Sequence, residues 1–233
     1  MNSTYSISVV LPVYNEAEIL EPSLLKINSF MSEHFEEFEL LVVESGSTDG
    51  SGDICDRLSE TIPSLKVIHE GQRNGIGSGT RLGYSTASKD IVLLYTVDFP
   101  FPLKSIIESL PHFSDHDCVL SYRSEDQRNS LFRKLQSFVY NNLVKTVLGL
   151  KVKHVNSAFK AFKRDVIQDF QLTANSGFID TETVFWVHRK KISFTEIPVV
   201  FTEREGGEST ITPFSFIFFL KELFILRKRF LFK

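Results

Sequence analysis

The sequence lacks the features that define several protein classes. Only two of its 233 residues are cysteines, Cys55 and Cys118, which excludes a disulfide framework and a structural zinc set and fits a reducing compartment. No uninterrupted apolar run reaches the roughly 18 residues of a transmembrane helix. The first residues carry no basic region of a signal peptide. A net charge of −3 argues against a globally basic nucleic-acid-binding protein, so no nucleic-acid partner is expected.

The residues that are present indicate a globular domain. Hydrophobic residues make up 42% of the chain and charged residues 24%, while 12 Gly and 8 Pro are too few for a collagen-like or disordered chain. The six histidines show no local signature of a zinc or nucleophilic site. We therefore expect one domain over residues 1–212, followed by a C-terminal helix over residues 213–233.

Hydrophobic periodicity predicts strands that alternate with helices. Strands are expected at residues 7–14, 38–43, 65–69, 91–97, 118–122, 158–162 and 193–202. Asn15, with Glu18 three residues later, is expected to cap the first helix. This alternation is typical of an α/β fold with a Rossmann-like, mostly parallel central sheet and helices on both faces. Pro198 predicts that the last strand lies at an edge.

Ligands bind outside the carboxyl ends of the strands in such sheets, so the residues that follow the strands form the candidate site. Asp98 follows the fourth strand, where a carboxylate can hold a divalent metal against a diphosphate. The alternative is a helix cap near Leu103. Glu44 ends the second strand and could accept hydrogen bonds from a nucleobase or a ribose. The alternative for Glu44 is a solvated side chain.

Three further segments are candidates for binding anions. The glycine-rich 74–80 segment, which includes Gly77 and Ser78, could cradle a phosphate, although it matches neither a dinucleotide-binding nor a Walker pattern. The paired glycines of the 204–209 segment suggest a loop that closes over a substrate. Arginine forks suit phosphate, and basic residues follow the fifth strand: Arg123, Arg128, Arg133 and Lys134. The alternative for the 74–80 segment is a flexible loop, and for the 204–209 segment a hairpin-like loop. The alternative for the basic residues is a solvated surface.

The order of the motifs resembles glycosyltransferase family 2. The resemblance covers about residues 6–212, and its motifs are VLPVYNE at 10–16, ESGSTDGS at 44–51, residues 74–83, Asp98, SYR at 121–123, NSAFKAF at 156–162 and EIPV at 196–199. It implies the GT-A fold. Within the family, the chain is most similar to the dolichol- and polyprenyl-phosphate sugar synthases.

The resemblance also implies roles for individual residues. Pro12, Tyr14 and Glu16 match the segment that lines the nucleoside pocket, and Glu44 matches a contact to the nucleoside. Asp98 matches the last acid of the metal motif and is the expected ligand of Mg²⁺ or Mn²⁺. The family positions associated with the phosphate of the acceptor lipid correspond to Arg123, Arg133 and Ser137. The mobile loop near the donor diphosphate corresponds to the segment with Arg204 and Ser209.

Several positions depart from the family pattern. The usual Asp-Asp pair is Glu44-Ser45, and the usual Asp-x-Asp is Thr96-Val97-Asp98. The usual Gln two residues further on is Pro100. A hard divalent cation prefers several oxygen ligands. Either the metal is held loosely, with the donor diphosphate and waters completing its shell, or the chain has drifted from catalysis.

The resemblance implies transfer of a sugar from a GDP- or UDP-sugar to a polyprenyl or dolichyl phosphate. Two alternatives stay open. One is transfer to a saccharide hydroxyl, which needs a general base such as Asp180 or Glu182. The other is a non-catalytic homologue that binds a nucleotide sugar or a partner.

The C-terminal segment is apolar around most of its circumference. Residues 213–233 include five lysines and arginines against one glutamate, a net charge of +4 in a chain of net charge −3. Lys221 and Glu222 near the middle disfavour a spanning helix. An apolar helix with clustered bases is typical of a helix on an anionic leaflet, which predicts a peripheral protein on the cytoplasmic face of a membrane. The alternative is docking on the domain or on a membrane-protein partner.

Overall fold

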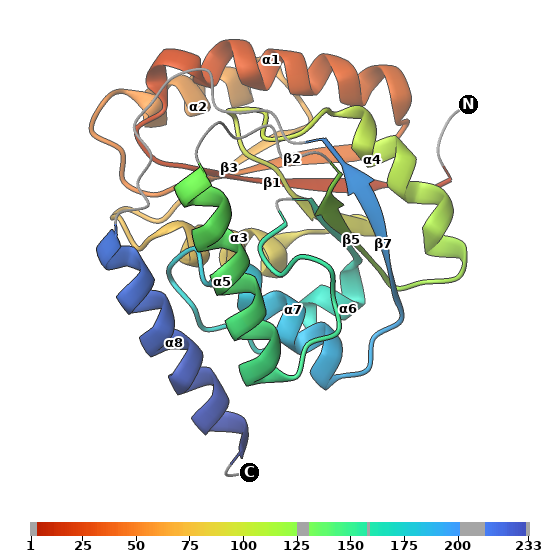
Figure 1. The fold of residues 1–233 in the computed structure, drawn as a ribbon. Helices are drawn as coiled ribbons and strands as arrows, with labels where there is room; N and C mark the ends of the chain where they lie inside the picture. Colours follow the sequence, from red (N-terminus) through yellow and green to blue (C-terminus); the bar gives the residue numbers. More distant parts are fainter. Residues whose placement is uncertain (1–3, 125–130, 158, 201–212, 232–233) are drawn as a thin grey trace.

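Seven strands form one sheet in the order β3-β2-β1-β4-β6-β5-β7 in the computed structural model (Figure 1). The structure describes residues 4–124, 131–157, 159–200 and 213–231. The strands are β1 Ile7–Val13, β2 Phe38–Glu44, β3 Leu65–His69, β4 Ile91–Leu94, β5 Cys118–Arg123, β6 Lys160–Lys163 and β7 Phe194–Val199.

The sheet is mostly parallel, as predicted. β1 pairs in parallel with β2 and β4, β2 with β3, and β5 with β7. β6 is antiparallel to both of its neighbours, β4 and β5. Since β4 and β5 both oppose β6, all the strands except β6 run in one direction, and their carboxyl ends meet at one edge. β7 lies at the edge of the sheet, which confirms the expectation from Pro198.

Two strands are shorter than predicted by three residues or more. β4 ends at Leu94, three residues before its predicted end, and the chain turns at residues 97 and 98, ahead of Phe99 with its left-handed φ of 51°. The Tyr95 N–H still donates to the Val10 carbonyl oxygen at 2.9 Å, so this turn begins beside β1. β7 ends at Val199. The part of the predicted strand at residues 201 and 202 lies outside the described residues.

Helices cover both faces of the sheet (Figure 1). One face is covered by α1, α2 and α4, and the other by α3, α5, α6, α7 and α8. Their bounds are α1 Ala17–His34, α2 Ser51–Thr61, α3 Ile76–Thr86, α4 Lys104–Ser109, α5 Leu131–Leu148, α6 Arg164–Gln168, α7 Ile179–Arg189 and α8 Pro213–Leu231. A short 3₁₀ helix, Leu110–Ser114, follows α4.

The alternation of side chains along the strands builds two hydrophobic clusters. On β1, Val9 and Leu11 belong to the cluster under α1 and α2, whereas Val10 between them belongs to the cluster under α3. Successive side chains of a strand point to opposite faces. A strand covered on both faces therefore reads as a continuous apolar run, as Ile7 to Val13 does.

α8 packs on the outside of the second cluster. Figure 1 shows it beside α5, and the rings of Tyr140 on α5 and Phe219 on α8 lie 5.9 Å apart. Leu223 and Leu226 are buried in the cluster. In the parts of the chain that the structure describes, we find no helix with the length and apolar character needed to cross a membrane.

Candidate functional site

The loops after β1 and β2 are joined by hydrogen bonds at the carboxyl edge of the sheet. The Asn15 side-chain oxygen accepts from the Thr48 N–H at 2.9 Å, and the Asn15 N–H donates to Ser47 Oγ at 3.0 Å. The Asp49 carboxylate accepts from the N–H of Ala17, the first residue of α1, at 2.9 Å. These bonds fix the two loops that carry the predicted nucleoside contacts.

The predicted capping box of α1 is therefore wrong. The helix begins after Glu16, which makes no side-chain capping hydrogen bond, and Asn15 has a left-handed φ of 53°. The open N–H groups at this end of the helix are satisfied from another loop, since Ser51 Oγ accepts from the Glu16 N–H and Asp49 from Ala17. Two side chains distant in sequence, those of Asp49 and Ser51, have taken the role expected of Asn15.

Glu44 is a buried carboxylate held in place by several donors. It is 4% exposed. Its Oε1 accepts from the Ser47 N–H at 2.5 Å, and its Oε2 lies 3.0 Å from His69 Nδ1. The other His69 nitrogen lies 2.9 Å from Asp56 Oδ1 on α2. The solvated alternative for Glu44 is therefore excluded.

The neighbours of Glu44 control its ionisation. Burial acts to raise its pKa, but hydrogen bonds from the Ser47 N–H and from His69 outweigh burial, and the pKa lies below its ordinary value. Hydrogen bonds to Glu44 and then to Asp56 raise the pKa of His69. The carboxylate of Glu44 therefore stays ionised, and it can act only as a hydrogen-bond acceptor.

Glu70, which the sequence reasoning missed, connects the β2 and β3 ends of the site to α3. It directly follows β3, and its two carboxylate oxygens accept from Ser45 Oγ and from Ser78 Oγ, each at 2.6 Å. Its position after a strand was the available signal. The carboxylate beside Ser78 suits a hydroxyl or N–H donor of a ligand better than a phosphate, because like charges repel.

Gly77 packs against a distant segment of the chain. Its N–H donates to the Asn175 carbonyl oxygen at 2.9 Å, and a Cβ at this position would lie 2.5 Å from the Ala174 carbonyl oxygen. Close approach of two backbones thus requires glycine here. Binding of a donor phosphate by Gly77 and Ser78 stays a prediction.

The predicted nucleoside-pocket segment lies at the carboxyl end of β1. Pro12 is in register with Val43 of β2 and Val13 with Glu44, so Tyr14 follows the residue paired with Glu44. Glu16 lies two residues further on, and its N–H donates to Ser51 Oγ. The guanidinium of Arg73, from the loop after β3, lies 4.4 Å from the centre of the Tyr14 ring. This loop therefore borders the same space as Tyr14.

Asp98 lies in the turn after β4, next to the carboxyl end of β1. Its Oδ1 accepts a hydrogen bond from Thr96 Oγ1 at 2.5 Å. The alternative role as a helix cap is excluded, because α4 has Leu103 at its N-cap and no side-chain capping bond. Thr96 thus stands beside Asp98 at the position where the resemblance implies a second acid.

The turn after β4 offers only part of the oxygen ligands that a hard divalent cation needs. Mg²⁺ is commonly bound through one or two carboxylates together with substrate phosphates and waters. Asp98 can supply one carboxylate, and Thr96 a neutral oxygen. Within residues 4–124, 131–157, 159–200 and 213–231, no three His, Cys, Asp or Glu side chains gather as a metal cluster. Any ion at this turn would therefore need further oxygen ligands from a bound substrate or from water.

The predicted acceptor residues lie beyond β4. Arg123 ends β5 at the same edge of the sheet, and its N–H donates to His154 Nδ1 at 3.1 Å. Ser137 is half-buried on α5. Arg133 is also on α5, but its side chain is outside the described part of the structure. Arg204 and Ser209 lie outside the described residues.

Both candidate general bases are bound to other groups of the protein. Asp180 Oδ1 pairs with the buried Lys160 Nζ at 2.7 Å. Glu182 is 1% exposed and accepts from the Thr173 N–H, the Thr173 hydroxyl and the Ala174 N–H, each at 2.8 Å. The suggestion of Glu182 as a base is therefore wrong, since a buried carboxylate with three internal donors cannot reach an acceptor hydroxyl.

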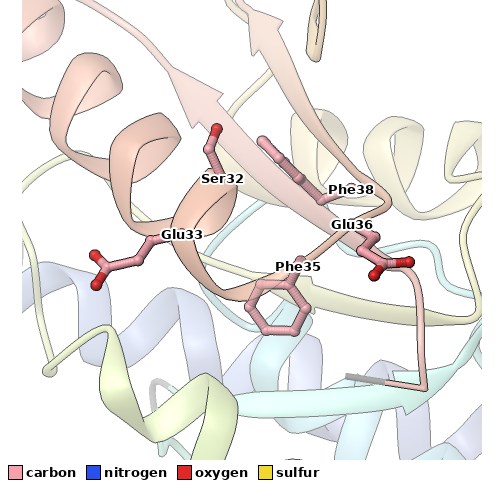
Figure 2. Close-up of a pocket in the computed structure, with 5 residues that line it drawn as sticks. All are labelled: Ser32, Glu33, Phe35, Glu36 and Phe38. Atoms are coloured by element: carbon pink, nitrogen blue, oxygen red, sulfur yellow. The ribbon is translucent and has the colours of Figure 1, made fainter. Parts of the chain in front are cut away.

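A separate pocket opens at the opposite edge of the sheet. Figure 2 shows it between the end of α1 and the start of β2, lined by Ser32, Glu33, Phe35, Glu36 and Phe38, and its volume is about 330 Å³. Its charged residues are both glutamates, which would repel a diphosphate. It also lies far from the carboxyl ends of the strands, so it is not the candidate site.

Comparison with known proteins assigns the chain to a family. The sequence profile described as glycosyl transferase family 2 matches residues 8–170, which is more than half of the chain. The chain belongs to glycosyltransferase family 2. This membership agrees with the order of motifs along the sequence.

Solved structures share the fold. Glucosyl-3-phosphoglycerate synthase from Mycobacterium tuberculosis, solved with Mn²⁺, UDP-glucose and phosphoglyceric acid, matches with a TM-score of 0.68 and 19% identity, covering 95% of this chain and 78% of that one. A mannosyltransferase from Pyrobaculum calidifontis with GDP-Man and Mn²⁺ matches with a TM-score of 0.65 and 21% identity, covering 88% and 58%. The predicted GT-A fold is confirmed.

Curated relatives include undecaprenyl-phosphate 4-deoxy-4-formamido-L-arabinose transferases. Those of Salmonella choleraesuis (strain SC-B67) and Salmonella paratyphi B are each 28% identical to this chain over 206 residues, which is 87% of this chain. The chain spans 62% of the length of these relatives.

Proposed function

We propose that this chain transfers a sugar from a nucleotide-sugar donor, a GDP- or UDP-sugar, to a polyprenyl or dolichyl phosphate. One observation carries the proposal. A single edge of the sheet holds Tyr14 and Glu44 at its nucleoside end, Asp98 in its middle and Arg123 beyond β6. Donor and acceptor could therefore meet beside Asp98. The relatives named for undecaprenyl phosphate support a lipid-phosphate acceptor.

The chemistry follows from the groups at this edge. An oxygen of the acceptor phosphate forms a bond to the anomeric carbon, the bond from that carbon to the donor diphosphate breaks, and its electron pair leaves on the diphosphate. Asp98 would hold Mg²⁺ or Mn²⁺, which neutralises charge on the leaving group. Glu44 would orient the nucleoside, and Arg123 the acceptor phosphate.

The structure favours a phosphate acceptor over a saccharide hydroxyl. A phosphate is already ionised near neutral pH and needs no general base. A hydroxyl needs one. Glu182 is enclosed by Thr173 and Ala174, and one carboxylate oxygen of Asp180 is paired with Lys160. Asp180 alone could therefore serve as the base, and it would do so while paired with a buried cation.

The reaction is tested with the full chain, a panel of labelled nucleotide sugars and a polyprenyl phosphate, followed by lipid extraction. Label should enter the lipid with one donor and should stay in water when the free polyprenol replaces its phosphate. Donor hydrolysis is measured with and without Mn²⁺. No transfer and no hydrolysis with any donor would support the non-catalytic alternative.

We expect Arg123→Ala to weaken binding of the acceptor and to leave binding of the donor unchanged. A charge-assisted hydrogen bond contributes about 1.5–3 kcal/mol, which corresponds to an increase of roughly 10- to 100-fold in the KM for the lipid phosphate. The donor KM should change little. Arg57→Ala is the matched control, because Arg57 is an exposed arginine paired with Glu21 on the helical surface. An equal rise in both KM values would place Arg123 at the diphosphate.

We further propose that residues 213–233 attach residues 1–212 to the cytoplasmic face of a membrane. α5 and α8 pack on one another, and both expose large apolar side chains, among them Phe138 at 65% and Phe224 at 58% exposure. We call this the α5–α8 surface; it comprises Leu135, Phe138, Val139, Phe224 and Ile225. Exposed bases accompany it on α8: Lys221, Arg227 and Lys228. Apolar side chains with clustered bases fit an anionic leaflet.

Vesicle flotation tests the membrane proposal. The full chain should float with anionic vesicles, whereas Phe138→Ser combined with Phe224→Ser should stay largely in solution, because each exposed ring contributes apolar area to the bilayer contact. Leu25→Ser is the control, since Leu25 is an exposed leucine on α1, on the other face of the sheet. If the double variant floats as well as the wild-type protein at low salt, the α5–α8 surface does not bind the membrane.

A further inference from the structure

Glu70 occupies a central position among the loops at the donor end of the site. Its Oε2 accepts from Ser45 Oγ and its Oε1 from Ser78 Oγ, each at 2.6 Å. A longer bond of 3.4 Å comes from Asn74 Nδ2. Its own N–H donates to the Glu44 carbonyl oxygen at 2.8 Å. Three segments therefore meet at this one carboxylate: the end of β2, the loop after β3 and the start of α3.

Glu70 reaches the position where this chain lacks an acid. Ser45 stands where the second acid of a pair is usual, and the Ser45 hydroxyl donates directly to Glu70. We propose that Glu70 supplies from β3 the carboxylate that Ser45 lacks, and that it accepts a hydrogen bond from the nucleoside of the donor. This inference rests on the proposed use of a nucleotide sugar.

The contacts of the surrounding loop point to the nucleoside. Arg73 lies over the Tyr14 ring at 4.4 Å. The loop after β2 packs on the loop after β3 so closely that a Cβ on Gly46 would lie 2.7 Å from the Gln72 Cα. The segment that carries Glu70 therefore borders the space beside Tyr14 and Glu44, where the nucleoside is expected.

The chemistry of a carboxylate selects the same part of the ligand. An ionised carboxylate only accepts hydrogen bonds, and it can accept about four. The three described donors leave room for one more. In a nucleoside diphosphate the donors are the ribose hydroxyls and the base N–H groups, whereas the diphosphate offers none and would be repelled. Glu70 thus fits the nucleoside and not the diphosphate.

Calorimetric binding of UDP and GDP to the full chain with Mn²⁺ tests the proposal. Glu70→Gln keeps the size of the side chain and removes its charge. We expect the dissociation constant of whichever nucleotide the wild-type protein binds to rise at least about tenfold, as for the loss of a hydrogen bond to a charged group. Glu60→Gln, an exposed glutamate of α2, should leave binding unchanged.

A transplanted acid separates a binding role from a structural one. Glu70→Ser should bind weakly, and Ser45→Asp combined with Glu70→Ser should recover most of the lost affinity because the charge returns to position 45. Wild-type affinity in Glu70→Gln would overturn the inference. A folded double variant that binds no better than Glu70→Ser would also overturn it. If the wild-type protein binds neither UDP nor GDP, the proposed function itself fails, and the inference fails with it.

Discussion

Asp98→Ala should reduce sugar transfer by at least about 1,000-fold, because stabilising charge on a leaving diphosphate contributes several kcal/mol and each 1.36 kcal/mol is a factor of ten in rate. Asp98 is the one acid that remains of the usual Asp-x-Asp, since position 96 is a threonine. Initial rates at saturating donor and Mn²⁺ measure the effect. The loss should appear in kcat, because the charge that Asp98 is proposed to stabilise develops in the transition state.

Two controls separate a catalytic effect from unfolding. Thermal unfolding of Asp98→Ala should resemble that of the wild-type protein, because Asp98 is only half-buried. Asp115→Ala should keep full activity, because Asp115 is an exposed acid just before β5, at the opposite edge of the sheet. Wild-type turnover in Asp98→Ala would show that the metal and the diphosphate are held elsewhere.

Glu182→Ala is expected to cause a large loss of stability, about 3–5 kcal/mol. The reason is that the buried carboxylate accepts from both the N–H and the hydroxyl of Thr173 and from the Ala174 N–H, and alanine leaves all three donors without this partner. For a chain of this size, a loss of that order lowers Tm by roughly 10 °C. Denaturant unfolding and calorimetry measure the two quantities.

Glu182→Gln is the matched variant, because its amide oxygen can keep part of the acceptor role. The free energy of unfolding should fall in Glu182→Gln by roughly half as much as in Glu182→Ala, or by less. Glu33→Ala, an exposed glutamate of α1, should change the free energy of unfolding by under about 0.5 kcal/mol. A change of that small size in Glu182→Ala would mean that Thr173 and Ala174 find other acceptors.

The activity of Glu182→Ala should fall as well when the protein remains folded. The segment that Glu182 holds continues to Asn175, whose carbonyl accepts from the Gly77 N–H at 2.9 Å. Arg81 on α3 also donates to the Ala174 carbonyl at 2.9 Å. The hydrogen bonds of Glu182 therefore help to position the start of α3, which borders the proposed donor end of the site.

The sequence by itself determined the order of the strands, their alternation with helices and the edge where the candidate site lies. These features are local, because an apolar run such as Ile7 to Val13 reports burial on both faces wherever it is placed. The positions of Tyr14, Glu44 and Asp98 at strand ends were predictable for the same reason. The order of the motifs was sufficient to indicate the family, which the match over residues 8–170 confirms.

The tertiary structure decided which side chains meet. Asn15 and Glu18 carry the pattern of a capping box, but Asp49 and Ser51 satisfy the N–H groups at the start of α1 from the next loop. Sequence patterns report neighbours along one element, whereas these partners are some thirty residues away and are brought together only when β1 and β2 pair.

The same physical limit explains the remaining differences. The position of Glu70 after β3 is visible in the sequence, but its contact with Ser45 exists only once β2 pairs with β3. Glu182 matched the chemistry of a base, but the fold buries it against Thr173 and Ala174. Residue type sets what a side chain can do, while burial and partners, which only the packed chain supplies, determine which of those roles it takes.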